Sequence, residues 1–509
     1  MVAKEAYNGP AAKGVAGDDD TVAVNIDENT VADWSEAEER AVKMKLDFIL
    51  LPILGLAFFA LQMDRGNISN ALTSTITQDL GVDTNQINVG SSLLSLGIVL
   101  LEIPSNILLQ RVGPKTWLSC QIVAWGFVAT FQNFITNYGG YLATRIILGL
   151  CEAGFIPGAL YTMSTWYKKD ETSLRISIFF LGNLLASAVT SLIGAGILSM
   201  GDRYGVAGWR WLFIVEGAIT VGVGLIFALL LPPRVGEGSP LISFGKWSYF
   251  SPRESYILVR RVLLDDPAKT TNHLRISGSD IWSTVKNPRI LAHVLITLTA
   301  TISVNAINTY GPSVIKSLGY GTVRANAMAS VGSFIAVVMV VTLGWLCDFT
   351  GKRGPMVLFP ALWAMIAFSC LRESVFGWSN GRRYAAVVLS MAVNSVVHIL
   401  NVGWLSVNCT SPQERSVAMA MIIMAANAAG IAGSQVFRTQ DAPLYLNAFT
   451  ACLALNAIAC VEIIAHSAWY YMSNKKLARS GDAPVVKGDT QATADGHREE
   501  LVRRWWWTW

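Results

Sequence analysis

The sequence predicts an all-α membrane protein whose twelve transmembrane helices form two six-helix bundles. Of its 509 residues, 52% are hydrophobic and only 15% are charged, against about 25% charged residues in an average soluble domain. Twelve spans of the ~20 apolar residues that cross ~30 Å of hydrocarbon would occupy about half of the chain. A soluble enzyme of this length would need polar surfaces that a mean hydropathy of +0.42 does not supply.

Charge-poor runs give candidate spans in two sets of six. The first set covers about 47–72, 86–109, 116–135, 141–165, 175–199 and 209–231, and the second covers about 289–312, 324–346, 355–372, 383–407, 416–437 and 446–472. The chain therefore divides into a polar N-terminal tail (1–46), a first bundle (47–233), a linker (234–288), a second bundle (289–474) and a C-terminal tail (475–509).

The positions of Lys and Arg place both tails and the linker in the cytosol. In the first bundle, eight basic residues lie at the ends assigned to the cytosol and three at the opposite ends, whereas the second bundle is evenly divided. Within the linker, Arg260, Arg261 and Asp265 indicate a solvated segment that tethers the two bundles. The net charge of +4 is spread between the apolar runs, which argues against a nucleic-acid partner.

Polar motifs interrupt the apolar runs at definite places. They are Asp64-Arg65-Gly-Asn67-Ile-Ser-Asn70 in span one, Pro104-Ser-Asn106 in span two, Arg145 to Gly158 in span four, Trp166-Tyr167, Gly208 to Phe213, and Trp404 to Asn408 with Arg415. On these motifs, residues 45–475 resemble the major facilitator superfamily, and within it the anion:cation symporters, which include fungal allantoate, nicotinate and pantothenate permeases. The resemblance implies the major facilitator fold and a fungal plasma membrane, with an intracellular membrane as the alternative.

Asp64 and Arg65 stand out on physical grounds. The uncharged run from Phe48 to Met63 has 16 residues, which cover only about 24 Å of helix, so the span must continue through the charged pair. Ionisable groups at such a depth are costly unless they pair or face a wet cavity, and they are functional candidates by default. The structural alternative is an interfacial pair at the outer end of the helix.

Arg145 and Glu152 lie seven residues apart in span four, which places them on one helix face two turns apart. We expect Arg145 to be the charge partner of Glu152. The resemblance implies that both converge with Asp64 and Arg65 on a central cavity, where Asp64, Glu152 and Arg145 serve proton coupling and Arg65 and Arg145 bind an anion. The structural alternative is a buried ion pair that only fastens helix one to helix four.

Further polar residues lie inside the predicted spans. Glu102 is a candidate second proton site, and Glu216 is interpreted as structural. Candidates for hydrogen bonds to a substrate are Asn305, Asn308 and Tyr310 in span seven, Asn394 and His398 in span ten, where Asn401 shares their face, and Asn427 in span eleven. Each of these could equally join neighbouring helices.

A loop motif recurs six spans apart. Arg111-Val-Gly113 follows span two, and Asp348-Phe-Thr-Gly351-Lys352-Arg353 follows span eight. The resemblance implies a cytoplasmic gate in which Arg111, Asp348, Lys352 and Arg353 latch the closed state. Gln110 occupies a position where the family usually has an acid.

The sequence thus predicts a transporter and not an enzyme. The leading hypothesis is proton-coupled import of a small organic anion, such as a vitamin or nitrogen-source carboxylate, by a monomer that needs no cofactor or metal and has protons, the anion and the lipid bilayer as its partners. The alternatives are a proton-driven exporter of a secondary metabolite and a membrane sensor that does not transport. The tail Trp505-Trp506-Trp507-Thr508-Trp509 could anchor at the membrane interface or be a spurious end of the sequence.

Overall fold

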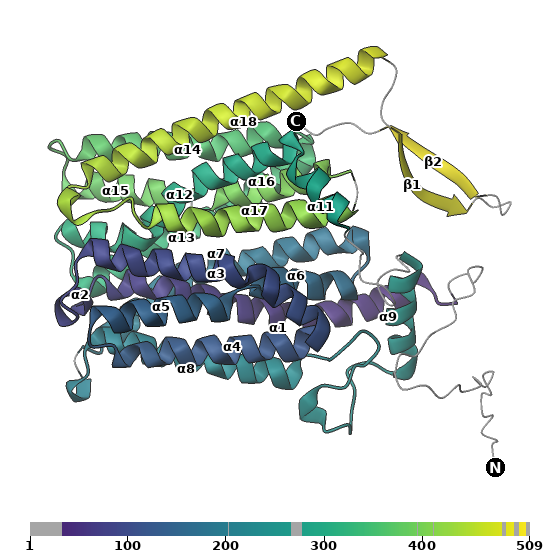
Figure 1. The fold of residues 1–509 in the computed structure, drawn as a ribbon, viewed down its shortest axis with the longest axis horizontal. Helices are drawn as coiled ribbons and strands as arrows, with labels where there is room; N and C mark the ends of the chain where they lie inside the picture. The colour runs from purple at the N-terminus through teal and green to yellow at the C-terminus, as the bar shows by residue number, and fades with distance from the viewer. Residues whose placement is uncertain are drawn as a thin grey trace.

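The computed structural model describes residues 33–201, 203–265, 277–393, 395–410, 412–480, 485–492 and 498–504. Long helices lie side by side in it (Figure 1), with the purple-to-teal helices of the first half of the chain in the lower part of the view and the green-to-yellow helices of the second half above them. We call the end of the molecule that carries α2 the α2 end, and the opposite end, which carries α9 and α11, the α9 end.

In the part of the first half that the structure describes, eight segments are α-helical. They are α1 (Glu36–Ala71), α2 (Ile76–Asp79), α3 (Thr84–Val112), α4 (Pro114–Phe131), α5 (Tyr138–Glu152), α6 (Phe155–Trp166), α7 (Lys169–Leu198) and α8 (Gly208–Leu230). Capping residues fix where two of these helices begin. Ser35 forms a capping box with Glu38 at the start of α1, and Asp83 forms one with Gln86 at the start of α3. Pro114 opens α4 at a position where its missing N–H costs nothing.

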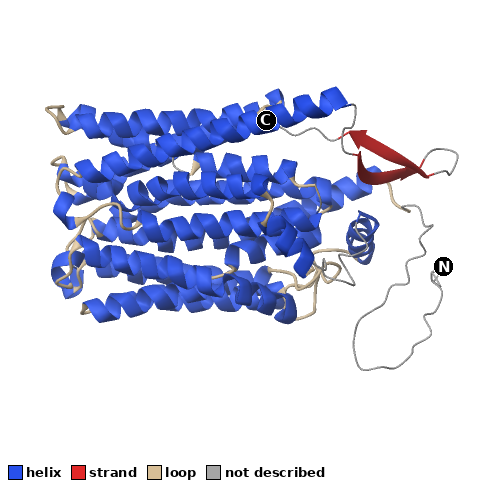
Figure 2. Cartoon of the chain, turned by 45° about the horizontal axis from the view of Figure 1, so that its top comes forward, coloured by secondary structure: helices blue, strands red, loops and turns tan. Residues whose placement is uncertain are grey.

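The second half begins after two linker helices, α9 (Pro252–Asp265) and α11 (Gly278–Val285). Its helices are α12 (Pro288–Ser317), α13 (Thr322–Thr350), α14 (Arg353–Ser374), α15 (Asn380–Met391), α16 (Val396–Asn408), α17 (Pro412–Gly433) and α18 (Leu446–Ser480). An antiparallel pair of strands, β1 (Val485–Ala492) and β2 (Arg498–Arg504), follows α18 (Figure 2). The strands lie in the predicted tail and were not expected from the sequence.

Ten helical segments in the described part of the chain are long and apolar enough to cross a membrane. The remaining two predicted spans fall on α4, which starts with a polar turn, and on α17, whose apolar stretch runs only from Val417 to Gly433. The architecture is therefore that of an all-α, multi-pass membrane protein, as the sequence predicts.

Two predicted spans are not continuous. Span four breaks between α5 and α6 at Gly154, whose φ is +82° and where a Cβ would lie 2.5 Å from the Ser105 Oγ. Span ten breaks between α15 and α16 next to Ser395, whose φ is +58°. His398 and Asn401 both lie on α16, after this break, whereas Asn394 lies outside the described residues.

Each half has its own apolar core, and the two halves meet along a separate set of helices. The core of the first half surrounds Phe58, Trp125 and Phe179, and one core of the second half surrounds Trp404 and Tyr470. Between the halves, α1 contacts α12, α3 contacts α17, and α7 contacts α13. A site between the two halves is therefore lined by these interface helices.

The expectation of a solvated linker is wrong for α9. Arg261 is fully buried, and its Nη1 lies 3.2 Å from the Glu171 Oε1 of α7. The Lys45 Nζ of α1 lies 2.9 Å from the Glu254 Oε2 of α9. Partial burial acts to raise the pKa of the Glu254 carboxyl, but hydrogen bonds from Lys45 and Ser251 lower it overall, so this contact is ionised at neutral pH. The linker helix is therefore docked on the first half, because its apolar face and its charges both have partners there.

Candidate functional site

A cavity of about 140 Å³ lies between the two halves of the molecule. Its walls come from α1, α3 and α5 on one side and from α12 and α17 on the other. The lining residues are Arg65, Ile68, Ser91, Leu94, Ser95, Ile98, Arg145, Asn305, Thr309, Ala426, Asn427, Gly430 and Ser434. Both predicted anion-binding arginines and two of the predicted amides thus share one cavity.

Arg65 forms an ion pair with Glu152 across the interface of α1 and α5. The Arg65 Nε donates to the Glu152 Oε2 at 2.7 Å, and the Glu152 side chain is fully buried. The sequence analysis assigned this partner role to Arg145, which is wrong as a direct contact. Residues seven apart on one helix are separated by about 10 Å along its axis, whereas Arg65 reaches Glu152 from the neighbouring helix.

Arg145 lines the cavity on the support of two aromatic rings. Its guanidinium carbon lies 5.2 Å from the centroid of Tyr141 and 5.9 Å from that of Phe213, in the range of cation–π attraction. The side chain is buried, and its Nε and Nη2 have no hydrogen-bond partner among the described residues. A buried donor without an acceptor costs free energy. The Arg145 guanidinium can therefore donate further hydrogen bonds to a ligand.

Asp64 is turned away from the cavity, although it is the neighbour of Arg65 in the chain. Its Oδ2 accepts from the Trp125 Nε1 at 3.1 Å and from the Thr220 Oγ1 at 2.8 Å, which are side chains of α4 and α8. Glu216 of α8 is also fully buried, and neither of its carboxyl oxygens has a hydrogen-bond partner in the described part of the chain. The interior of the first half therefore holds two acids that the cavity does not reach.

Glu102 and Asn427 connect the two halves at the cavity. The Asn427 Nδ2 of α17 donates to the Glu102 Oε2 of α3 at 3.3 Å, and Glu102 is 5% exposed. Asn305 lines the same cavity from α12. A buried carboxylate near Arg65 thus accepts a hydrogen bond from a neutral amide of the opposite half.

The profile of the family described as Major Facilitator Superfamily matches residues 54–434. The chain belongs to the major facilitator superfamily. It is 28% identical over 471 residues to the protein named Major facilitator-type transporter hxnP of Emericella nidulans, with 91% of this chain and 92% of that protein covered. It is also 28% identical over 494 residues to the MFS-type transporter cnsO of Penicillium expansum, with 94% and 93% covered.

The fold agrees with this membership of the major facilitator superfamily. The partially occluded inward open structure of the xylose transporter XylE from E. coli superimposes with a TM-score of 0.63 at 15% identity, covering 81% of this chain and 96% of that one. The protein is therefore a membrane transporter of the major facilitator superfamily and not an enzyme.

Other predicted binding residues of this transporter lie outside the lining of the cavity. Tyr310 is buried at the interface, where its hydroxyl donates to the Asn88 Oδ1 and its ring stacks on Phe437. His398 lies in α16 with its Nδ1 3.5 Å from the Thr297 Oγ1. Asn308 lies on α12 and is half-buried. Asn394 lies outside the described residues.

The predicted gate residues of the transporter all lie towards the α9 end. Arg111 is exposed in the last turn of α3, and Lys352 is the exposed N-cap residue of α14. Arg353 is half-buried and places its Nη1 near Gly403 of α16. Asp348 belongs to α13, but its side chain lies outside the described part of the structure.

Several hydroxyls of the cavity were missed by the sequence analysis. Ser91 and Ser95 of α3, Thr309 of α12 and Ser434, which directly follows α17, all line it. Ser91, Ser95, Ile98 and Glu102 follow steps of four, three and four residues, which is one helix face. This spacing could have predicted that the two serines share a helix face with Glu102. Only Glu102 was predicted as a site residue, because single hydroxyls in a transmembrane helix often donate to the backbone of their own helix.

Proposed function

We propose that this transporter is a member of the anion:cation symporters that imports a small organic anion, a carboxylate, together with protons. What supports the proposal is one observation: two arginines, Arg65 and Arg145, line a single cavity between the two halves, and the Arg145 Nε and Nη2 have no hydrogen-bond partner among the described residues. A guanidinium presents a planar fork of donors that fits a carboxylate. The neutral amides and hydroxyls of the opposite wall would bind the rest of the substrate.

Proton coupling follows from the placement of the acids. The cavity arginines are accompanied by Glu152, which pairs with Arg65, and by Glu102, which accepts from Asn427. When an incoming carboxylate takes up arginine donors, Glu152 loses part of its compensating charge and binds a proton more readily. Anion binding and proton binding then assist each other by the same free energy.

Alternating access would move the two halves against each other while this charge cluster stays within the first half. We place the cavity in a plasma-membrane protein that acts as a monomer, with both tails and the linker in the cytosol and a latch of Arg111, Asp348, Lys352 and Arg353 at the α9 end. A cysteine introduced into the linker should then resist an impermeant thiol reagent added to intact cells. Labelling of that cysteine would show that the linker faces the outside of the cell.

The direct test is the accumulation of a panel of labelled carboxylates in cells that express the chain, with and without a proton uncoupler. Uptake should rise as the external pH falls and should collapse with the uncoupler, because a proton must load with the anion. Uptake that changes neither with the external pH nor with the uncoupler would indicate a uniporter or an exchanger. Export of preloaded compound would favour the exporter, and binding without accumulation would favour a sensor.

A further inference from the structure

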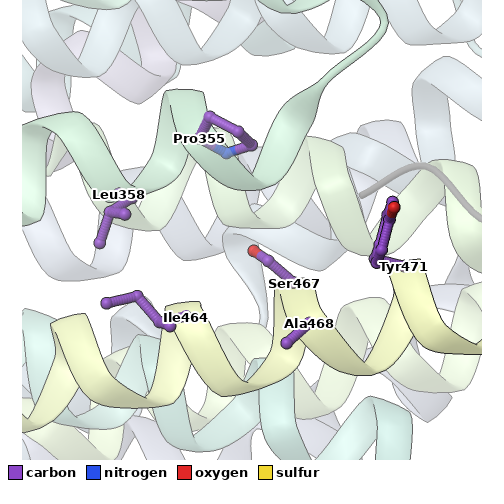
Figure 3. Close-up of a pocket in the computed structure, with 6 residues that line it drawn as sticks. All are labelled: Pro355, Leu358, Ile464, Ser467, Ala468 and Tyr471. Carbon is purple, nitrogen blue, oxygen red and sulfur yellow. The ribbon is translucent and has the colours of Figure 1, made fainter.

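An apolar groove of about 470 Å³ lies between α14 and α18 on the outer side of the second half (Figure 3). It is lined by Pro355 and Leu358 of α14 and by Ile464, Ser467, Ala468 and Tyr471 of α18. The side chains of Ile464 and Tyr471 are 52% and 50% exposed. Because α18 runs along the outer edge of the helical assembly in Figures 1 and 2, the groove faces away from the substrate cavity and towards lipid.

Basic residues continue the groove at one end only. Ile464, Ala468 and Tyr471 follow steps of four and three residues, and the next step of four reaches Lys475, which is exposed. On α14, the exposed Lys352 is the N-cap residue, three positions before Pro355. Helix α14 starts and helix α18 ends at the α9 end of the molecule. Lys352 and Lys475 therefore lie at the same end of the groove, which we call its mouth.

The site has an apolar part and a basic part, which match the acyl chain and the anionic head group of a phospholipid. The groove carries no charged residue among its lining side chains, so it suits a hydrocarbon chain. The mouth carries two lysines beside the N-terminus of a 22-residue helix, whose dipole also favours an anion. A basic cluster directly outside a transmembrane helix is the usual signature of attraction to anionic lipid.

We propose that this groove binds an anionic phospholipid of the leaflet at the α9 end, with an acyl chain between α14 and α18 and its phosphate at Lys352 and Lys475. A zwitterionic lipid would bring a choline cation next to the two lysines and should bind less well. The site shares no residue with the substrate cavity, and it has only Lys352 in common with the proposed latch, so binding of the lipid does not depend on the proposed transport of an organic anion.

The test uses the purified full chain in phosphatidylcholine vesicles that contain a trace of phospholipid with a photoreactive acyl chain. The probe is phosphatidylserine in one sample and phosphatidylcholine in the other, and the labelled peptides are identified by mass spectrometry. The peptides that contain Leu358 and Ala468 should be labelled about 30-fold more by phosphatidylserine, as expected for two lysine contacts at the surface. Equal labelling by the two lipids would overturn the proposal.

Variants then separate a specific site from general attraction to the surface. Lys475→Ala should lower the phosphatidylserine labelling about fivefold towards the phosphatidylcholine level. Lys476→Ala is the matched control, because it removes the same charge about 100° further round the helix, and it should leave the labelling unchanged. Equal effects of the two substitutions would refute a site at the groove. Ala468→Trp should remove the labelling by both lipids, and if that variant fails to fold, the comparison of lipids on the unmodified chain still decides.

Discussion

The two halves of this transporter contribute different chemistry to the same cavity. The first half supplies the charged groups, Arg65 and Arg145, with Glu152 and Glu102 next to them. Among the described lining residues, the second half supplies only neutral groups, which are Asn305, Thr309, Asn427 and Ser434. The difference suggests a division of labour in which one half handles charge and protons and the other selects the neutral part of the substrate.

This division has a physical reason in a protein whose halves move. Charged groups inside a membrane are expensive unless they stay paired. The Arg65–Glu152 ion pair lies within the first half, so it can persist while the halves separate. The hydrogen bond from Asn427 to Glu102 crosses the interface at 3.3 Å. If the halves separate there, Glu102 loses this one amide donor but stays near Arg65, which belongs to its own half.

The largest effect is expected from removing the Arg145 guanidinium from the charged half of the cavity. Arg145→Ala should lower initial uptake by about 100-fold, since a charge-assisted hydrogen bond contributes up to about 3 kcal/mol. Arg145→Lys keeps the charge but loses the planar fork, and it should retain intermediate activity. Uptake rates at matched surface expression provide the measurement. Full activity of Arg145→Ala would assign this arginine to packing on Tyr141 and Phe213 alone.

A smaller effect is expected from the neutral half. Asn427→Ala and Asn305→Ala should each raise KM for the carboxylate about fivefold, the amount expected for one neutral hydrogen bond of about 1 kcal/mol. The ratio of uptake with and without a pH gradient should stay the same, because no proton carrier has been removed. If uptake by either amide variant no longer responded to the pH gradient, the second half would also take part in proton coupling, and the proposed division between the halves would be wrong.

The smallest effect is expected at a residue that the sequence suggested for binding but that the structure places beyond the cavity lining. Tyr310→Phe removes the hydroxyl that donates to Asn88 between the two halves. KM should be unchanged, and thermal stability should fall by about 1 kcal/mol for the lost hydrogen bond. A large rise in KM, measured beside Asn305→Ala, would place Tyr310 in the substrate site.

The fold was largely predictable from the sequence, because each span must be apolar for about 20 residues and each polar motif interrupts that rule. The burial of Arg145 and Glu152 in one helix followed from their spacing alone. The pairing of Glu152 with Arg65 did not, because it depends on the relative height of two helices that the sequence does not encode locally. The burial of Arg261 was missed because its partner Glu171 lies on a helix of the first half, far away in the sequence.

We propose that Glu152 carries the proton that drives anion accumulation. Reconstituting Glu152→Gln in vesicles tests this role by two assays on one preparation, counterflow exchange of labelled substrate and uphill accumulation driven by an inward pH gradient. Exchange should be retained, because the arginines remain, and uphill accumulation should be lost, because the amide cannot take up a proton. If Glu152→Gln concentrates the substrate as well as the parent protein does, Glu152 is not the coupling residue, and Asp64 or Glu102 must carry the proton.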